Sequence, residues 1–295
     1  MSITGNKIRV NDVDLNVYIG GNGPAVLLLH GFPDSNALWR NLIPSLIGAG
    51  YRVVAPDQRG FGESGAPAGI QKYRAEVLVS DAIGLLDALD ISVAHLVAHD
   101  YGAMVGWILA GQHGDRFCSY TALSCGHPTA YVNAGKRQKK MIRLRSLFLL
   151  PWFPEMLLKA GNWAMFRKLV RDHPETEHWL KDMARPGRLT AAVNWYRANF
   201  RVISSITGVA DVRIPVMGVW SADDFALDEE QMLNSAQHVQ GSFRYERLDG
   251  CGHWIPLDEP ETTETLLLEF IADKKILSNV DENPKPNKRN RIERP

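Results

Sequence analysis

The stretch LVAHDYGAMVG, residues 96–106, decides how the rest of this chain is interpreted. Its apolar run before His99 is typical of a buried strand, and the run that resumes after Gly102 is typical of a buried helix. Asp100 stands between the two. A carboxylate at such a junction must be paired, hydrogen-bonded or used in chemistry, because burying an unpaired charge is costly. The remainder of the sequence therefore has to supply partners for Asp100.

The composition is that of a globular protein with a neutral charge balance. The 295 residues are 45% hydrophobic, which is enough for a substantial core in one large domain or two small ones. The 33 Lys and Arg equal the 33 Asp and Glu, so the composition does not favour binding to nucleic acid or to an anionic membrane. We expect a small, largely apolar organic substrate and no nucleic-acid partner.

Neither the cysteines nor the glycines predict a cofactor. Cys118, Cys125 and Cys251 are too scattered for a disulfide framework and have no metal-ligand spacing, which indicates a reducing compartment and no metal. The glycine-rich stretch 55–67 lacks the Gly-Lys-Ser/Thr ending of a phosphate-binding loop. No stretch reaches the roughly 18 apolar residues of a membrane span, and the N-terminus lacks an apolar signal region. We expect a cytoplasmic protein without a membrane span; the sequence does not indicate its oligomeric state.

Short apolar runs alternate with longer helix-like patterns along most of the chain. This alternation predicts an α/β fold with a mostly parallel sheet flanked by helices. The stretch 7–24 alternates apolar and polar residues around Asn11-Asp12, as an antiparallel hairpin at the edge of such a sheet would. The expected buried strands are 25–29, 53–55, 94–98, 120–124, 216–220 and 243–248.

The strand pattern is interrupted between residues 128 and 207 and then resumes. We therefore expect an α/β core built from residues 1–127 and 208–277, with a helical insertion at 128–207. Residues 278–295 are polar and short of apolar side chains, so we expect a disordered tail. Within the insertion, Trp152 is expected to line an apolar pocket or to pack in the core. The basic segment 136–145 is interpreted as a solvated helix face, with an anionic substrate or partner as the alternative.

Asp100 lies at the centre of Ala98-His99-Asp100-Tyr101-Gly102. Small residues on either side of a central nucleophile, between a strand and a helix, allow the sharp turn known as a nucleophile elbow. Ala98 stands where glycine is usual and keeps the steric logic. Because Asp is also a good N-cap, the alternative is that Asp100 only begins a helix.

Two later residues could complete a catalytic triad with Asp100. Enzymes with this elbow place the acid and then the histidine after it in the chain, each in a loop beyond a strand. Asp224 follows the strand expected at 216–220, and His253 follows the one at 243–248. The alternatives are that Asp224 caps a helix, that Asp223 or Asp228 is the acid instead, or that His253 simply packs on its neighbours.

An oxyanion hole requires two converging backbone N–H groups, one from the residue after the nucleophile and one from an early loop. Tyr101 follows Asp100, and Phe32 lies in the His30-Gly31-Phe32-Pro33 turn after a strong strand. The backbone amides of Phe32 and Tyr101 are therefore the candidates. A plain turn made by Gly31 and Pro33 would have the same sequence.

The motifs HGFPDS (30–35), PDQRGFGES (56–64), HDYG (99–102) and CGHW (251–254) together resemble the α/β-hydrolase superfamily. Within it they resemble the branch of epoxide hydrolases and haloalkane dehalogenases, and soluble epoxide hydrolases most closely. The resemblance implies that the helical insertion is a cap over the nucleophile. It also implies that Asp100 attacks a saturated carbon to form an ester, which His253, oriented by Asp224, hydrolyses with an activated water.

Epoxide hydrolases of this branch protonate the opened oxygen with cap tyrosines, and the motif NWYRANF (194–200) places Tyr196 in that role. The first cap tyrosine is not evident, because its equivalent position is about Leu144; Tyr131 is an alternative donor from another direction. A dehalogenase with the same ester chemistry remains the second interpretation. A small-molecule binding protein without turnover is the third.

Overall fold

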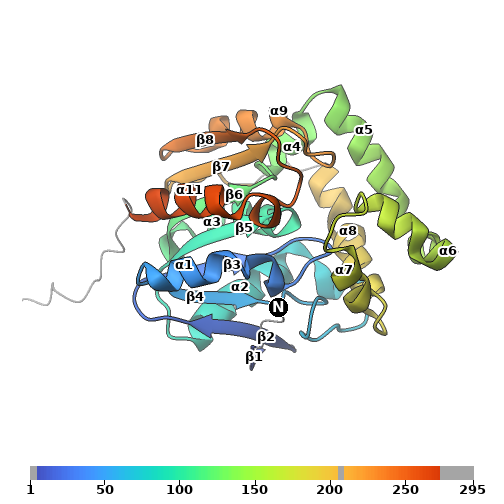
Figure 1. The fold of residues 1–295 in the computed structure, drawn as a ribbon, viewed down its shortest axis with the longest axis horizontal. Helices are drawn as coiled ribbons and strands as arrows, with labels where there is room; N and C mark the ends of the chain where they lie inside the picture. Colours follow the sequence, from blue (N-terminus) through green and yellow to red (C-terminus); the bar gives the residue numbers. More distant parts are fainter. Residues whose placement is uncertain (1–4, 205–208, 273–295) are drawn as a thin grey trace, which may run out of the picture.

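The computed structural model describes residues 5–204 and 209–272, with the side chains of residues 200–204 left undescribed. The predicted tail, residues 278–295, lies outside the described residues. The core is one eight-stranded sheet in the order β1-β2-β4-β3-β5-β6-β7-β8 (Figure 1). Its strands are β1 (Asn6–Val10), β2 (Val13–Gly20), β3 (Ala25–Leu29), β4 (Arg52–Pro56), β5 (Ala94–His99), β6 (Phe117–Leu123), β7 (Val216–Ser221) and β8 (Phe243–Leu248).

The sheet is parallel except at one edge, as expected. Strand β2 pairs antiparallel with both β1 and β4, and every other neighbouring pair is parallel. The β1–β2 hairpin turns at Asn11, which adopts the left-handed φ of 51° that asparagine tolerates well. The alternation of residues 7–24 therefore predicted the hairpin correctly.

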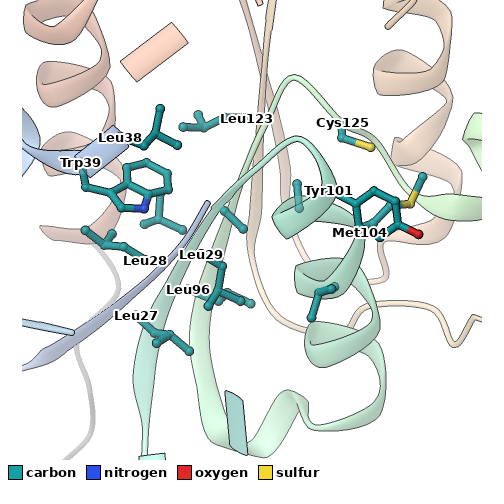
Figure 2. Packing of buried hydrophobic residues seen from close by; sticks show 14 of the residues in the cluster. Leu27, Leu28, Leu29, Leu38, Trp39, Leu96, Tyr101, Met104, Leu123 and Cys125 are labelled. Atoms are coloured by element: carbon teal, nitrogen blue, oxygen red, sulfur yellow. The ribbon is translucent and has the colours of Figure 1, made fainter. Parts of the chain in front are cut away.

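Helices cover both faces of the sheet. Helices α1 (Leu42–Gly48) and α11 (Pro260–Ala272) lie on one face, and α2 (Ala75–Ala88) and α3 (Tyr101–Gln112) lie on the other (Figure 1). Figure 2 shows how β3 is enclosed, with Leu38 and Trp39 on one side of its leucines and Tyr101 and Met104 of α3 on the other. Shorter elements are α9 (Glu229–Leu233), α10 (Ile255–Asp258), and the 3-10 turns η1 (Asn36–Trp39), η2 (Ile70–Tyr73), η3 (Gly114–Arg116) and η5 (Asn234–His238).

The helices and 3-10 turns described between β6 and β7 are joined by short loops, and no strand is described there. They are α4 (Pro128–Asn133), α5 (Lys136–Arg145), the 3-10 turn η4 (Ser146–Leu149), α6 (Phe153–Leu169), α7 (Thr176–Met183) and α8 (Arg188–Ser204). Helix α6 is interrupted at residues 160–163, where three successive residues have left-handed φ values of 59°, 54° and 69°. Helices α5 and α6 lie farther from the sheet than α8 in the view of Figure 1.

Helix α8 is fastened to the core by two tryptophan contacts. The Trp195 indole N–H donates to the carbonyl of Arg59 at 3.0 Å, and the Tyr101 hydroxyl donates to the carbonyl of Trp195 at 2.9 Å. Trp195 itself is buried. The expectation for Trp152 is wrong: its side chain is 68% exposed, because it lies at the start of α6 on the outer side of the helical segment.

Candidate active site

Asp100 sits at a strained turn between β5 and α3. Its φ of 50° and ψ of −121° are rare for a residue with a side chain, and such strain persists only where the surroundings enforce it. A Cβ on Gly102 would run into the carbonyls of Leu29 and His30, so this turn requires glycine there. The Asp100 side chain makes no capping hydrogen bond to α3. The alternative that Asp100 serves only to cap a helix is therefore not supported.

Backbone amides hold one oxygen of the Asp100 carboxylate. The Phe32 N–H donates to Oδ2 at 3.1 Å, and the Tyr101 amide also interacts with the carboxylate. A Cβ on Gly31 would lie 2.6 Å from the same oxygen, which explains why glycine precedes Phe32. Of the two amides predicted for an oxyanion hole, that of Phe32 is bonded to Oδ2, and that of Tyr101 interacts with the same carboxylate.

His253 lies beside the other oxygen of the Asp100 carboxylate and is paired with Asp224 on its far side. The Nε2 of His253 is 3.6 Å from Oδ1 of Asp100, and its Nδ1 is 2.9 Å from Oδ2 of Asp224. The remaining oxygen of Asp224 accepts the amides of Ala226 and Leu227 at 2.7 and 2.9 Å. Asp224 is therefore fully buried with both oxygens occupied.

Neither alternative acid takes the place of Asp224. Asp228 is the N-cap of α9 and accepts the amide of Glu230 at 3.2 Å. Asp223, immediately before Asp224, is exposed. The structure thus brings Asp100, Asp224 and His253 together in the order and spacing expected of a triad.

The loop that carries His253 is fixed by its backbone. The carbonyl of His253 accepts hydrogen bonds from Nε2 of His99 at 2.8 Å and from the Ser124 hydroxyl at 2.9 Å. His99 is the last residue of β5 and Ser124 directly follows β6, so both donors lie at the same edge of the sheet as Asp100. Sequence analysis did not single out His99 or Ser124 for this task, because nothing local marks a side chain that holds a distant carbonyl.

The charges within this cluster shift one another's pKa values. Burial lowers the pKa of His253, but the carboxylates of Asp224 and Asp100 outweigh burial and raise it to about 10. Burial raises the pKa of Asp100, but the contact with His253 outweighs it and holds this pKa far below its usual range. The ligand-free site therefore contains a His253 cation between two carboxylates at neutral pH.

A cavity of about 510 Å³ opens above Asp100. Its lining is mostly apolar and comes from α5, η4, α6, α8 and the loops that carry Phe32, Phe225 and Trp254. Tyr196 faces Asp100 across this cavity, and its ring packs against Tyr101 at 5.2 Å and Phe148 at 5.0 Å between centroids. Burial, and then the charge of Asp100, raises the pKa of the Tyr196 hydroxyl. Tyr196 is therefore a protonated phenol at neutral pH.

The position equivalent to the first tyrosine of the resembled epoxide hydrolases, about residue 144, has no hydroxyl in this chain. Leu144 lines the cavity there, and the next residue, Arg145, also lines it. The Arg145 guanidinium donates to the Tyr131 hydroxyl at 3.1 Å and to the carbonyl of Ala226 at 2.7 Å. No carboxylate among the described residues forms an ion pair with Arg145. Sequence analysis missed Arg145, because it lies in the basic segment interpreted as a solvated helix face.

The part of the chain that the structure describes contains no cluster of His, Cys, Asp and Glu side chains suited to a metal ion. Its three cysteines are all free thiols. None of the described helices combines the length and the apolar character needed to cross a membrane.

Comparisons with known proteins give one consistent result. The family profile of the alpha/beta hydrolase fold matches residues 24–143. The chain is 48% identical to an epoxide hydrolase of Caballeronia sordidicola over 90% of its own length and 92% of the relative's. It is 30% identical to epoxide hydrolase 3 of Xenopus tropicalis, covering 90% of this chain and 77% of that one. A crystal structure of Bacillus megaterium epoxide hydrolase with an inhibitor is 25% identical, with a TM-score of 0.82 over 90% of this chain and 100% of that one.

Proposed function

Because this chain belongs to the α/β-hydrolase family, on its epoxide hydrolase branch, we propose that it opens an epoxide to a vicinal diol through a covalent ester on Asp100. The observation that carries the proposal is the environment of one carboxylate. Asp100 has backbone amides on one oxygen and the His253–Asp224 pair beside the other, and a tyrosine hydroxyl faces it across an apolar cavity. Each of these groups has a task in the reaction.

In the first half-reaction, Oδ1 of Asp100 attacks an epoxide carbon and the C–O bond of the ring breaks. The other oxygen, Oδ2, is held by the Phe32 amide and becomes the ester carbonyl. The bonding pair of the broken bond goes to the epoxide oxygen, which takes a proton from Tyr196. An ester is the useful intermediate because water can cleave it, whereas the ether that a serine would form resists hydrolysis.

In the second half-reaction, Nε2 of His253 takes a proton from water, and the resulting hydroxide attacks the ester carbonyl carbon of Asp100. Negative charge then develops on Oδ2, where the amides of Phe32 and Tyr101 stabilise it. Collapse of this intermediate breaks the bond between the carbonyl carbon and the oxygen that attacked the epoxide. The departing alkoxide takes the proton of the new carboxylic acid, which releases the diol and restores the Asp100 carboxylate. His253 keeps the proton that it took from water, as in the free site, and the proton that it gave up after ester formation returns to the Tyr196 phenolate.

Formation of the ester itself prepares His253 to act as the base. In the free site, the Asp100 charge helps to raise the pKa of His253 to about 10, so the imidazole is protonated at neutral pH. Esterification removes that charge. Burial then pulls the pKa of His253 down against Asp224 alone, and the imidazole releases its proton. The base is therefore active only after Asp100 has reacted.

Arg145, which lines the cavity and is bonded to Tyr131, supplies the polar contact that the first cap tyrosine would make. During ring opening, negative charge moves from Asp100 toward the oxygen that faces Tyr196. Burial raises the pKa of both Tyr131 and Tyr196, and the Arg145 cation opposes that rise, which favours proton donation on that side of the cavity. In this proposal the helical segment 128–204 is the cap that carries the proton donors, and the two flanking segments form the hydrolase core.

The test uses a variant that stops after the first half-reaction. H253Q removes the base and leaves the nucleophile, so incubation with an epoxide such as styrene oxide should add the mass of one substrate to the protein, on the peptide that contains Asp100. The wild-type enzyme should release diol. A haloalkane dehalogenase would instead release halide from haloalkanes and no diol from epoxides, and a binding protein would gain no covalent mass from either.

A further inference from the structure

The exposed apolar residues of this protein are concentrated on one face. The described residues include ten exposed large hydrophobic side chains, and eight of them lie between residues 144 and 169, in the span from the end of α5 to the end of α6. The most exposed are Trp152, Leu144 and Met156, at 68%, 56% and 54%. Contiguous exposed apolar surface on a globular protein usually marks a binding site.

This apolar face surrounds the opening of the active-site cavity. Leu144, Leu147, Met165 and Leu169 are exposed and also line the cavity above Asp100. They come from two different helices and the turn between them, so the apolar residues gather at one opening instead of being scattered along the chain. Figure 1 shows α5 and α6 at the outer side of the helical segment, where a large partner can approach.

The same face carries a strong positive charge. Residues 136–169 contain nine Lys and Arg against one acid, Glu155, a formal net charge of +8, so the rest of the neutral chain carries −8. Three of the nine cations do not face an external partner freely, because Arg145 lines the cavity, Arg137 pairs with Asp228 and Arg167 pairs with Glu177. Glu155 is already paired with Arg197 at 2.6 Å. Lys136, Lys139 and Lys140 of α5 are exposed, and no acid among the described residues pairs with them. These cations are therefore available to an external anion.

We infer that the face formed by α5, η4 and α6 docks on an anionic lipid bilayer. Apolar side chains that enter the headgroup region, flanked by lysines that attract anionic headgroups, are the features of an interfacial membrane-binding surface. A symmetric pairing of this face with the same face of a second copy fits poorly, because both faces are cationic and would repel each other. The neutral overall charge had indicated no affinity for an anionic membrane; it concealed two opposite local charges.

Docking in this orientation gives the cavity an opening toward the lipid. Apolar epoxides concentrate in bilayers, so a substrate could pass from the acyl chains into the cavity without crossing water. This consequence rests on the proposed function. The docking itself does not, because it depends only on the outer surface of α5, η4 and α6.

The experiment measures sedimentation of the full-length protein with vesicles of phosphatidylcholine alone or of equal parts phosphatidylcholine and phosphatidylglycerol. We expect binding to the mixed vesicles, weak binding to the neutral ones, and release by high salt. The variant K136Q/K139Q/K140Q should lower the partition coefficient on mixed vesicles about a hundredfold, since each lysine near such a surface contributes about fivefold. The variant W152S/M156S should weaken binding as well. None of the five residues changed in the two variants lines the cavity.

Matched controls lie elsewhere on the surface. R74Q/K181Q removes exposed cations outside the face, and I70S/L233S removes the two remaining exposed large apolar residues. Both should bind vesicles like the wild type. The inference is overturned if the wild type binds neither vesicle, binds both equally, or loses binding equally in the controls. It is also overturned if sedimentation velocity shows a wild-type dimer that W152S/M156S converts to a monomer without vesicle binding.

Discussion

Replacing Asp224 with asparagine should stop the second half-reaction and leave the first intact. Asp224 is fully buried; one oxygen accepts two backbone amides and the other accepts Nδ1 of His253. An asparagine oxygen can keep the two amides, which turns its NH₂ group toward His253. Two donors then face each other, so the imidazole must shift its proton from Nδ1 to Nε2. Nε2 faces Asp100 at 3.6 Å, and a protonated Nε2 cannot accept a proton from water.

The magnitude follows from the tautomer. The same exchange in a comparable buried acid–histidine pair lowers kcat about 10⁴-fold, which corresponds to about 5.4 kcal/mol of lost transition-state stabilisation. We expect a loss of this size in kcat for diol formation by D224N. Because attack by Asp100 requires no base, the ester should accumulate, and quenched-flow mass spectrometry should show the substrate mass on most of the D224N protein during turnover.

D223N is the matched control, since Asp223 is the adjacent residue, carries the same charge and is exposed. It should keep wild-type kcat and show little ester. The reasoning is refuted if D224N turns over at the wild-type rate, or if D224N forms the ester as slowly as it hydrolyses it. The second result would mean that Asp224 maintains the loop and does not orient His253.

Three further predictions address the other groups of the site. Y196F should lower the single-turnover rate of ester formation by about 10²-fold or more while leaving hydrolysis of the preformed ester unchanged, because its proton is needed only at ring opening; equal loss in both steps would contradict this role. R145M should slow ester formation and R145K should restore much of the rate, with hydrolysis again as the internal control; if the two variants behave alike, the Arg145 charge has no part in ring opening. The Asp100 charge contributes to the raised pKa of His253, about 10, so D100N should lower this pKa. NMR titration of the imidazole in both proteins would measure the difference. A folded-state pKa raised from 6.5 stabilises the protein at pH values below 6.5, and this contribution is lost as pH rises to about 10, so the unfolding free energy of D100N should fall less over that interval. An unchanged pKa in D100N would show that Asp224 alone raises it.

The sequence was sufficient for the fold and for the prediction that Asp100, Asp224 and His253 lie together. Alternating apolar runs predict the strands. The residues that follow parallel strands lie at the same edge of the sheet. Once the strands were identified, Asp100, Asp224 and His253 were therefore expected to lie at that edge. The positions of the Phe32 and Tyr101 amides were predicted in the same way, because both residues lie just after a strand. The positions of these groups depend on short stretches of sequence whose conformation is determined largely by neighbouring residues.

Tertiary structure decided which side chains of the helical segment 128–204 enter the cavity. Arg145 is the last residue of α5, two residues after the exposed Arg143, and its sequence context is that of a solvated cation. It lines the cavity because α5 packs against α4, where Tyr131 accepts its hydrogen bond. Trp152 shows the reverse, an apolar side chain that packing leaves at the surface. The rotation of a helix about its own axis is determined by the helices and loops that it contacts. These contacts lie far away in the sequence. The residues adjacent to a helix in the sequence therefore cannot determine which of its side chains enter the cavity.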